Sequence, residues 1–339
     1  MREIESVFQD KALACLLGGL IGDAMGTPTE GQDYRQIVDT YGWLDEVRCD
    51  GTDDTIMKHI LAEALIDSDG YATGDIWAAK WLARWDDIFG QKVSKFFISV
   101  LHTAQKLRRH SIPRMAALGN MPSSSSAMCI APVGIVNACN PRQAARQAYS
   151  LAGLIHVHDV GFCQDGAAAI AAAVAEAFRR EATTETILAA ASAHIEPLSG
   201  QEMLERIEAA LALAREHGEY EAFRERLYAQ SERFFQEIIC DARETVPLTL
   251  ALFLLGDGDP ARCIPYAANL GRDADTIATM VGAIAGAAHG TKAMPQRWLD
   301  ALSDAMLDEQ RELAARLCEM ALTKVHAERA AGEELLALA

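Results

Sequence analysis

Asp273-Ala274-Asp275-Thr276 opens an apolar run over residues 277–288, and Gly51-Thr52-Asp53-Asp54-Thr55 opens another over residues 56–66. Both runs are apolar enough to predict helices that lie in a core rather than on the surface. Thr and Asp cap free amides at helix N-termini, so capping alone would explain either stretch. The pattern occurs twice, however, and adjacent aspartates repel each other unless a cation or solvent compensates their charge. The two helix starts therefore predict hard oxygen ligands suited to Mg²⁺, Mn²⁺ or Ca²⁺.

The rest of the chain predicts an all-α protein. Half of the 339 residues are apolar, and aromatic residues make up only 6%. Apolar positions recur with helical periodicity, and no segment has the alternation of a strand. No repeat, linker or composition break divides the chain, so we expect one domain over residues 1–339. Helices are expected at residues 53–67, 92–109, 127–138, 141–154, 161–180, 201–216, 219–239, 242–255, 260–270, 275–290 and 297–337 (the last one broken), with a first helix ending near residue 22 and a tryptophan-rich helix after Asp75.

The charge balance limits the classes of partner. The chain has 31 lysines and arginines against 48 acids, for a formal charge of −17. This balance argues against a nucleic-acid partner and favours the binding of cations. No signal peptide is visible, no apolar run is long enough to span a bilayer, and the eight cysteines lack zinc-site spacing. We therefore expect a cytoplasmic protein of a reducing compartment, with no membrane partner.

Four segments follow one another across residues 10–295 in an order and spacing that resemble a known family. They are Gly18-Gly19-Leu20-Ile21-Gly22-Asp23-Ala24-Met25-Gly26 with Glu30-Gly31, Thr52-Asp53-Asp54-Thr55, Ala127-Met128-Cys129-Ile130-Ala131-Pro132-Val133-Gly134 with His156-Val157-His158, and Asp273-Ala274-Asp275-Thr276-Ile277-Ala278 running into Gly282-Ala283-Ile284-Ala285-Gly286. In this combination the chain resembles the ADP-ribosylglycohydrolase family, which includes dinitrogenase reductase-activating glycohydrolase. The second and fourth segments are the most specific.

The resemblance implies an orthogonal multi-helix bundle around two divalent cations, with the C-terminal helices packed on it. Magnesium or manganese is expected, and calcium could take their place in a crystal. Transferred residue by residue, one cation would be held by Thr52, Asp53, Asp54 and Asp275. The other would be held by Asp273, Asp275, Thr276 and Glu30, so that Asp275 bridges the two.

Such a site is suited to breaking a glycosidic bond to ribose. The bond breaks through an oxocarbenium-like state, and two cations can chelate ribose hydroxyls, orient a water and lower its pKa. A carboxylate then takes the proton of the water, and Glu30, Asp53 and Asp54 are the candidates for this catalytic role. The sequence does not show which of the three carboxylates is the general base.

Two departures from the family pattern bear on the substrate. Arg272 replaces a glycine of the fourth segment, where it could contact a phosphate or simply be a surface or capping charge. Ser123-Ser124-Ser125-Ser126 replaces a glycine loop and Cys129 an arginine, so this wall of the pocket should differ, because glycines let a backbone approach a ligand closely. The two histidines are equally well explained as core or loop residues. The expected substrate contacts are Ser124, Ser125, Ser126, Met128, His156, His158 and Arg272.

Three functions fit these residues. The first is a metal-dependent hydrolase that cleaves a ribosyl bond of an ADP-ribose derivative or an ADP-ribosylated protein. The second is a hydrolase of a small nucleoside-like ribosyl compound, which would explain the serine run. The third is a non-catalytic relative that binds a ligand, although such a relative would be expected to lose metal ligands, and all of them are present here.

Overall fold

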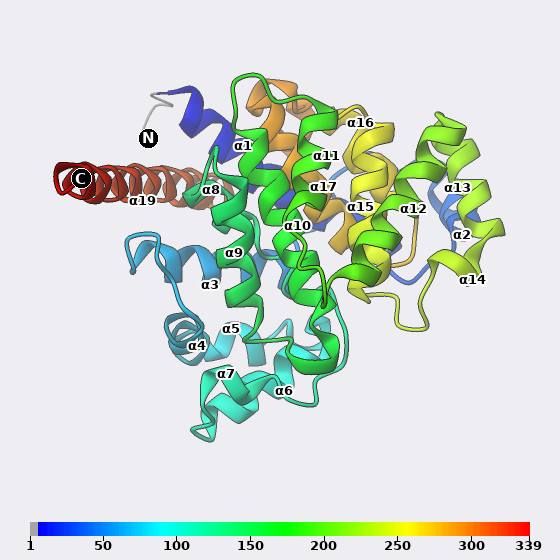
Figure 1. Ribbon diagram of the computed structural model, residues 1–339. Coiled ribbons are helices and arrows are strands. Elements are labelled where there is room, and N and C mark those ends of the chain that lie inside the picture. The colour runs from blue at the N-terminus through cyan, green and yellow to red at the C-terminus, as the bar shows by residue number, and fades with distance from the viewer. Residues whose placement is uncertain (1–5) are drawn as a thin grey trace.

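The computed structural model describes residues 6–339 and is built from helices (Figure 1). The described part of the chain contains no β-strand, only an isolated antiparallel bridge between Asp33 and Gly271. This confirms the predicted all-α class. The α-helices are α1 Val7–Gly26, α2 Tyr34–Tyr41, α3 Asp53–Ile66, α4 Gly74–Ala83, α5 Trp85–Phe89, α6 Ile98–Arg108, α7 Pro113–Ala116, α8 Ala131–Val136, α9 Pro141–Ala152, α10 Phe162–Ala177, α11 Thr184–Ala193, α12 Gln201–His217, α13 Tyr220–Ala229, α14 Ser231–Phe234, α15 Ala242–Leu255, α16 Pro260–Ala268, α17 Ala274–His289, α18 Gln296–Asp300 and α19 Asp304–Ala337, with 3-10 turns η1 Thr27–Thr29, η2 Val93–Lys95, η3 His158–Val160 and η4 Thr291–Ala293.

Most predicted helices are present, and the differences lie at glycines, capping residues and loops. α1 continues through its glycines to Gly26 instead of ending near residue 22, and α8 begins at Ala131 rather than at residue 127. The tryptophan-rich helix ends at Ala83, and the segment expected as one helix over 219–239 ends in an irregular stretch after Phe234. α2 and α11 were not predicted. Tertiary packing decides these boundaries, because it can outweigh local propensity.

α1 and α17 form the centre of the molecule. Both helices are buried along most of their length, from Ala12 to Gly26 in α1 and from Ala274 to Ala287 in α17. A side chain at Gly18 would overlap the backbone of Gly282, and one at Gly22 would overlap the carbonyl of Ala278. The absence of side chains at these glycines therefore lets the two backbones touch.

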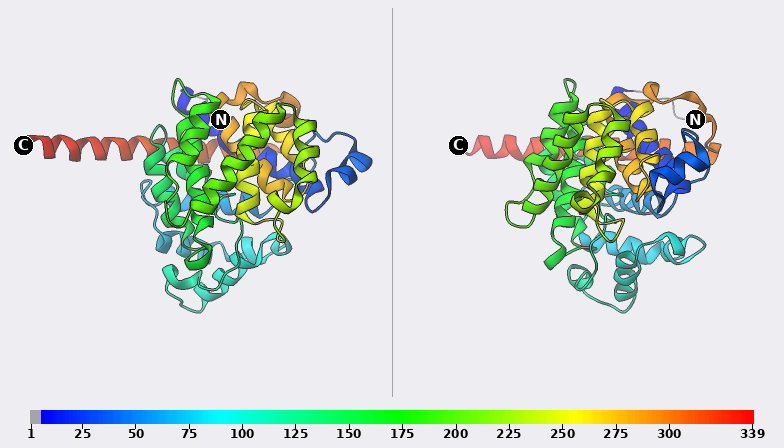
Figure 2. Two further views of the ribbon diagram at one scale, coloured as in Figure 1. Left: turned by 45° about the vertical axis from the view of Figure 1, so that its right-hand side comes forward. Right: turned by 90° about the vertical axis from the view of Figure 1, so that its right-hand side faces the viewer.

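The other helices surround this pair. α8 to α11 lie on one side, α4 to α7 form a layer at one end, and α12 to α16 lie on the opposite side (Figures 1 and 2). α19 packs on the body with its first half, burying Leu313 and Leu317, and its last turns extend into solvent. No helix in residues 6–339 is both long enough and apolar enough to cross a membrane.

Replacing Gly18 with alanine should destabilise the protein. The new methyl group would overlap the Gly282 carbonyl, and overpacking a core typically costs about 1–3 kcal/mol. Gly74→Ala is the matched control, because nothing lies within 4 Å of a Cβ built there. Denaturant titration should show a lower free energy of unfolding for Gly18→Ala than for Gly74→Ala. Equal values would contradict the close contact between α1 and α17.

Candidate metal centre

The starts of α3 and α17 meet beside the end of α1. Gly26 lies against the backbone of Asp275, so close that a side chain at residue 26 would overlap it. One α1 turn earlier, Asp23 faces the first residues of α3. The two acidic stretches, far apart in the sequence, are therefore neighbours because both lie against the same glycine-rich end of α1.

Asp23 anchors the start of α3. Its Oδ2 accepts hydrogen bonds from the backbone amides of Thr52 (2.8 Å) and Thr55 (3.1 Å) and from the Thr55 hydroxyl (2.6 Å). Its Oδ1 accepts one from the Thr52 hydroxyl at 2.9 Å. A helix N-terminus leaves amides without intrahelical partners, and a buried carboxylate satisfies them well. We did not predict this role from the sequence, although an aspartate inside an otherwise apolar helix was the available signal.

A short backbone pairing brings Glu30 to α17. The amide of Gly31 donates to the Arg272 carbonyl at 2.8 Å, and the amide of Arg272 donates to the Gln32 carbonyl at 2.9 Å. Gly31 has a φ of 75° and Gly271 a φ of 83°, in the left-handed region that favours glycine. The pairing places the segment after η1 alongside the residues that precede Asp273.

Two groups of carboxylates result, and they share one residue. Oxygen atoms of Asp23, Asp54 and Asp275 lie within 4.8 Å of one another, as do oxygen atoms of Glu30, Asp273 and Asp275. The shared carboxylate belongs to Asp275, at the first turn of α17. Hard oxygen donors in this arrangement suit magnesium, manganese or calcium.

The buried carboxylates are electrostatically unfavourable when all are charged. Burial, followed by neighbouring carboxylates, raises the pKa of Asp53, Asp54 and Asp275 well above the ordinary value. Burial and the nearby charge of Glu30 raise the pKa of Asp273 to about 8. The residues present therefore fit divalent cations, because a cation would relieve both the desolvation and the mutual repulsion.

Two lysines supply part of the missing positive charge. Lys95 Nζ lies 2.7 Å from Glu30 Oε2 at the edge of the site. Lys58 is fully buried, and its Nζ donates to the Leu16 carbonyl at 3.2 Å. Burial lowers the pKa of Lys58, while the charges of Asp23 and Asp54 act in the opposite direction. Two lysines do not balance six carboxylates.

The remaining predicted ligands lie around the two groups. The Asp54 carboxylate accepts hydrogen bonds from the hydroxyls of Thr276 (3.4 Å) and Thr279 (3.2 Å). The Thr52 hydroxyl is turned to Asp23. Asp53 belongs to neither carboxylate group. Its carboxylate is only 8% exposed, but its hydrogen-bond partner is its own backbone amide rather than another side chain. Asp53 is thus the least constrained carboxylate of the site.

The serine run forms a buried wall next to Asp273. The Ser124 hydroxyl donates to Asp273 Oδ2 at 3.2 Å. The two ring nitrogens of His156 lie 2.9 Å from the Ser123 hydroxyl and 3.0 Å from the Ser126 hydroxyl. Burial lowers the pKa of His156 to about 3, so the ring is neutral. His156 therefore holds the serine run in place through side-chain hydrogen bonds.

Three predicted substrate contacts lie in very different surroundings. The Arg272 guanidinium pairs with Glu244 through two hydrogen bonds of 2.7 Å, donates to the Gln236 carbonyl and lies over the Phe235 ring. The positive charge of Arg272 is thus paired with Glu244 within the protein. His158 is on the surface, where its Nδ1 lies 3.4 Å from Oδ1 of the neighbouring Asp159. Met128 is buried in the core.

This geometry defines the class: an all-α protein with two buried carboxylate groups that share an aspartate at the meeting point of two helix starts. A model of the ADP-ribosylglycohydrolase family matches residues 5–330, and the chain belongs to that family. Its members are ADP-ribosyl hydrolases.

Individual relatives are distant but cover most of the chain. YegU of Escherichia coli (strain K12) is 28% identical, with 95% of this chain and 99% of YegU aligned. The human ADP-ribosylhydrolase ARH3 is 27% identical, with 84% of this chain and 86% of ARH3 aligned. A solved structure described as an ADP-ribosylglycohydrolase-related protein complex has a TM-score of 0.70 at 23% identity and covers 93% of this chain and 99% of its own. The likeness to that structure supports the all-α fold of this chain.

Adding magnesium or manganese should raise the thermal midpoint, because a ligand that binds only the native state stabilises it by about 2.7 kcal/mol at one hundred times its Kd. Asp275→Asn should abolish most of this shift, since Asp275 belongs to both carboxylate groups. Asp54→Asn should remove only part of it, and Asp39→Asn, on the exposed face of α2, should keep it. Calorimetry showing unchanged metal affinity in Asp275→Asn would refute the assignment.

The metal-free protein should lose stability as the pH rises. The folded pKa of Asp273 is about 8, whereas an unfolded aspartate titrates near about 3.9. Folded protein then holds a proton that the unfolded chain releases, so the free energy of unfolding falls between about pH 4 and pH 8. Thermal melts in a chelator should show this decline, and magnesium or Asp273→Asn should reduce it. A midpoint that rises steadily over this range would contradict the expectation.

Proposed function

We propose that this protein is a metal-dependent hydrolase that cleaves a ribosyl glycosidic bond in an ADP-ribose derivative or an ADP-ribosylated target. The observation that carries the proposal is the pair of buried carboxylate groups joined by Asp275. Family membership supports it, because the family consists of ADP-ribosyl hydrolases. The proposal also treats residues 1–339 as one domain, since a single continuous core of buried residues extends from α1 to α19.

In this proposal, two divalent cations lie on either side of Asp275, the residue that the two carboxylate groups share. Magnesium or manganese is the expected metal. When bound, the cations supply Lewis acidity and a fixed anchor for neighbouring hydroxyls of the ribose. The proposed ligands of one cation are Thr52, Asp53, Asp54 and Asp275, and those of the other are Glu30, Asp273, Asp275 and Thr276. Asp23 is left out of both sets, because four hydrogen bonds from the start of α3 already occupy its oxygens.

Among the three candidate bases, Asp53 is the least engaged. Glu30 is paired with Lys95, and Asp54 accepts hydrogen bonds from two threonines, whereas Asp53 is bonded only to its own backbone amide. Burial raises the pKa of Asp53, which strengthens it as a proton acceptor once it is ionised. Asp53 would take the proton of the attacking water, and the water oxygen would bond to the anomeric carbon as the glycosidic bond breaks.

The serine wall bears on the substrate class. Ser124 reaches Asp273, and His156 holds Ser123 and Ser126, so this wall presents hydroxyls beside the carboxylates. Arg272 is engaged by Glu244 and does not replace an arginine lost at Cys129. The polar, neutral wall favours a small ribosyl or ADP-ribosyl compound over arginine-linked ADP-ribose on a protein. A nucleoside-like substrate is the second candidate, and a non-catalytic binding role is the third.

Assays with three substrates distinguish these three candidate functions. Purified protein with magnesium should release ADP-ribose or ribose from a small compound, such as O-acetyl-ADP-ribose or a nucleoside, faster than ADP-ribose from an arginine-linked protein. Losing a charge-assisted contact to phosphate weakens binding by about 1.5–3 kcal/mol, roughly tenfold or more. Asp54→Ala should abolish turnover, and Asp39→Ala should retain it. Fast, metal-dependent release from the arginine-linked protein would contradict the substrate assignment, and absence of turnover on every substrate would favour the binding role.

A further inference from the structure

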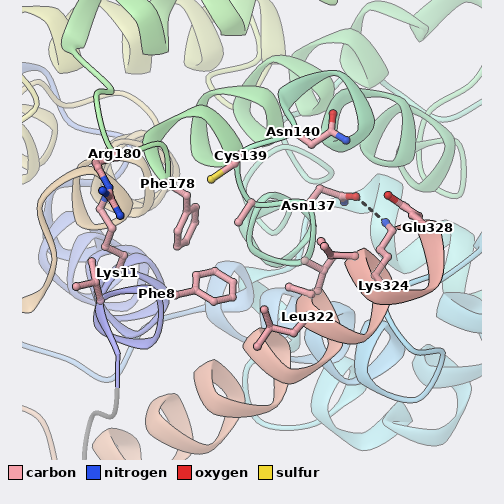
Figure 3. Close-up of a pocket in the computed structure, with 15 residues that line it drawn as sticks. Phe8, Lys11, Asn137, Cys139, Asn140, Phe178, Arg180, Leu322, Lys324 and Glu328 are labelled. Carbon is pink, nitrogen blue, oxygen red and sulfur yellow. Dashed lines mark hydrogen bonds between the residues drawn. The ribbon is translucent and has the colours of Figure 1, made fainter. Parts of the chain in front are cut away.

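An apolar groove lies away from the acidic site, at the place where α19 leaves the body (Figure 3). It encloses about 850 Å³. Phe8 of α1 and Phe178, which follows α10, form one wall, and Leu322 and Val325 of α19 form the other. Leu322 is 53% exposed and Val325 is 56% exposed, although both are large apolar residues. An open apolar surface of this kind usually marks an interaction site.

Beyond the groove, α19 continues without any contact that buries it. Residues 325–339 are all exposed, and the helix extends well clear of the rest of the molecule (Figure 2). At 1.5 Å per residue, the helical part of this tail is about 20 Å long. A helix of this length is only marginally stable in water unless it packs against something. The tail, defined here as residues 325–339, therefore begins at the groove wall with Val325 and is not buried by any other part of the described chain.

The apolar pattern of the groove continues along the tail. Leu322, Val325, Gly332 and Leu336 lie on one face of the helix, at spacings of three, seven and four residues. Arg329 lies between them on this face and pairs with Glu333 of the same helix at 2.7 Å. Leu335 and Leu336 are 69% and 77% exposed. Gly332 has no neighbour within 4 Å, so a second helix could approach closely there. The same face thus lines the groove at one end and is bare at the other.

We propose that a second copy of this chain fills the groove, with two α19 helices running antiparallel and the tail of each lying in the groove of the other. A two-fold arrangement covers both apolar surfaces at once, because α19 supplies the tail and one wall of the groove. With Leu336 of one copy against Val325 of the other, the stem of Arg329 lies against Gly332 of the second copy. The close approach that Gly332 allows is then used on both sides.

Charge complementarity favours this occupant. Arg180 lines the groove and makes no ion pair with any residue in the described part of the chain. The tail is acidic at its apolar end, where Glu333 and Glu334 precede Leu335. Opposite charges at flanking positions select partner and orientation in paired helices.

The test is the oligomeric state of the full chain, measured by sedimentation and light scattering over a range of concentrations. Wild type should dimerise. Leu322→Glu in the groove and Leu335→Glu with Leu336→Glu in the tail should each weaken dimerisation at least tenfold. Leu338→Glu is the matched control, because Leu338 is 86% exposed on the opposite face of the same helix, and it should leave the dimer intact. All four positions are at least half exposed, so the variants should fold, and circular dichroism checks this.

Charge reversal tests the pairing itself. Arg180→Glu alone and Glu334→Arg alone should weaken the dimer, and the double reversal should restore it. A wild type that stays monomeric at all concentrations would overturn the proposal. So would a dimer that survives both the groove and the tail substitutions. A monomer whose groove instead binds an apolar anion such as laurate would overturn it too, and would assign the groove to a small ligand.

Discussion

The backbone contact between α1 and α17 is the constraint on which the rest of the structure depends. Gly18 and Gly22 have no side chains, so α1 lies directly against the backbone of α17. Gly26 continues the contact to the first turn of α17, beside Asp275. Because Asp23 belongs to the same end of α1 and holds the start of α3, the glycine contact also determines how close the two acidic helix starts come.

This arrangement concentrates negative charge where water is excluded. Desolvation and mutual repulsion raise the pKa of Asp53, Asp54, Asp273 and Asp275, so the carboxylates oppose folding when they are ionised without a counter-charge. Lys58 and Lys95 offset part of that charge. Binding of the proposed cations would therefore be coupled to folding, because the ions would relieve the main electrostatic cost of the site.

The serine run beside the carboxylates is fixed by side-chain hydrogen bonds, unlike a glycine loop. A glycine loop owes its shape to backbone freedom, whereas Ser123 and Ser126 are held here by the neutral ring of His156. The hydroxyl of Ser124 is directed to Asp273, so the wall is linked to the proposed metal ligands. The proposed substrate wall and the proposed metal ligands thus share a hydrogen bond, and a change in the serine run should affect both.

The sequence alone was sufficient to predict the all-α class and the two acidic helix starts, because helical periodicity and N-terminal capping are local properties. The family was predicted from the resemblance of four sequence segments. It did not predict that Asp23 anchors α3, that Asp53 lies outside both carboxylate groups, or that Arg272 is paired with Glu244. It also placed His158 with the substrate contacts, whereas the structure places it on the surface. These features depend on backbone approaches between distant segments, such as Gly31 with Arg272 and Gly26 with Asp275. Only the tertiary structure decides which charges then become neighbours, since burial and pairing arise from residues far apart in the chain.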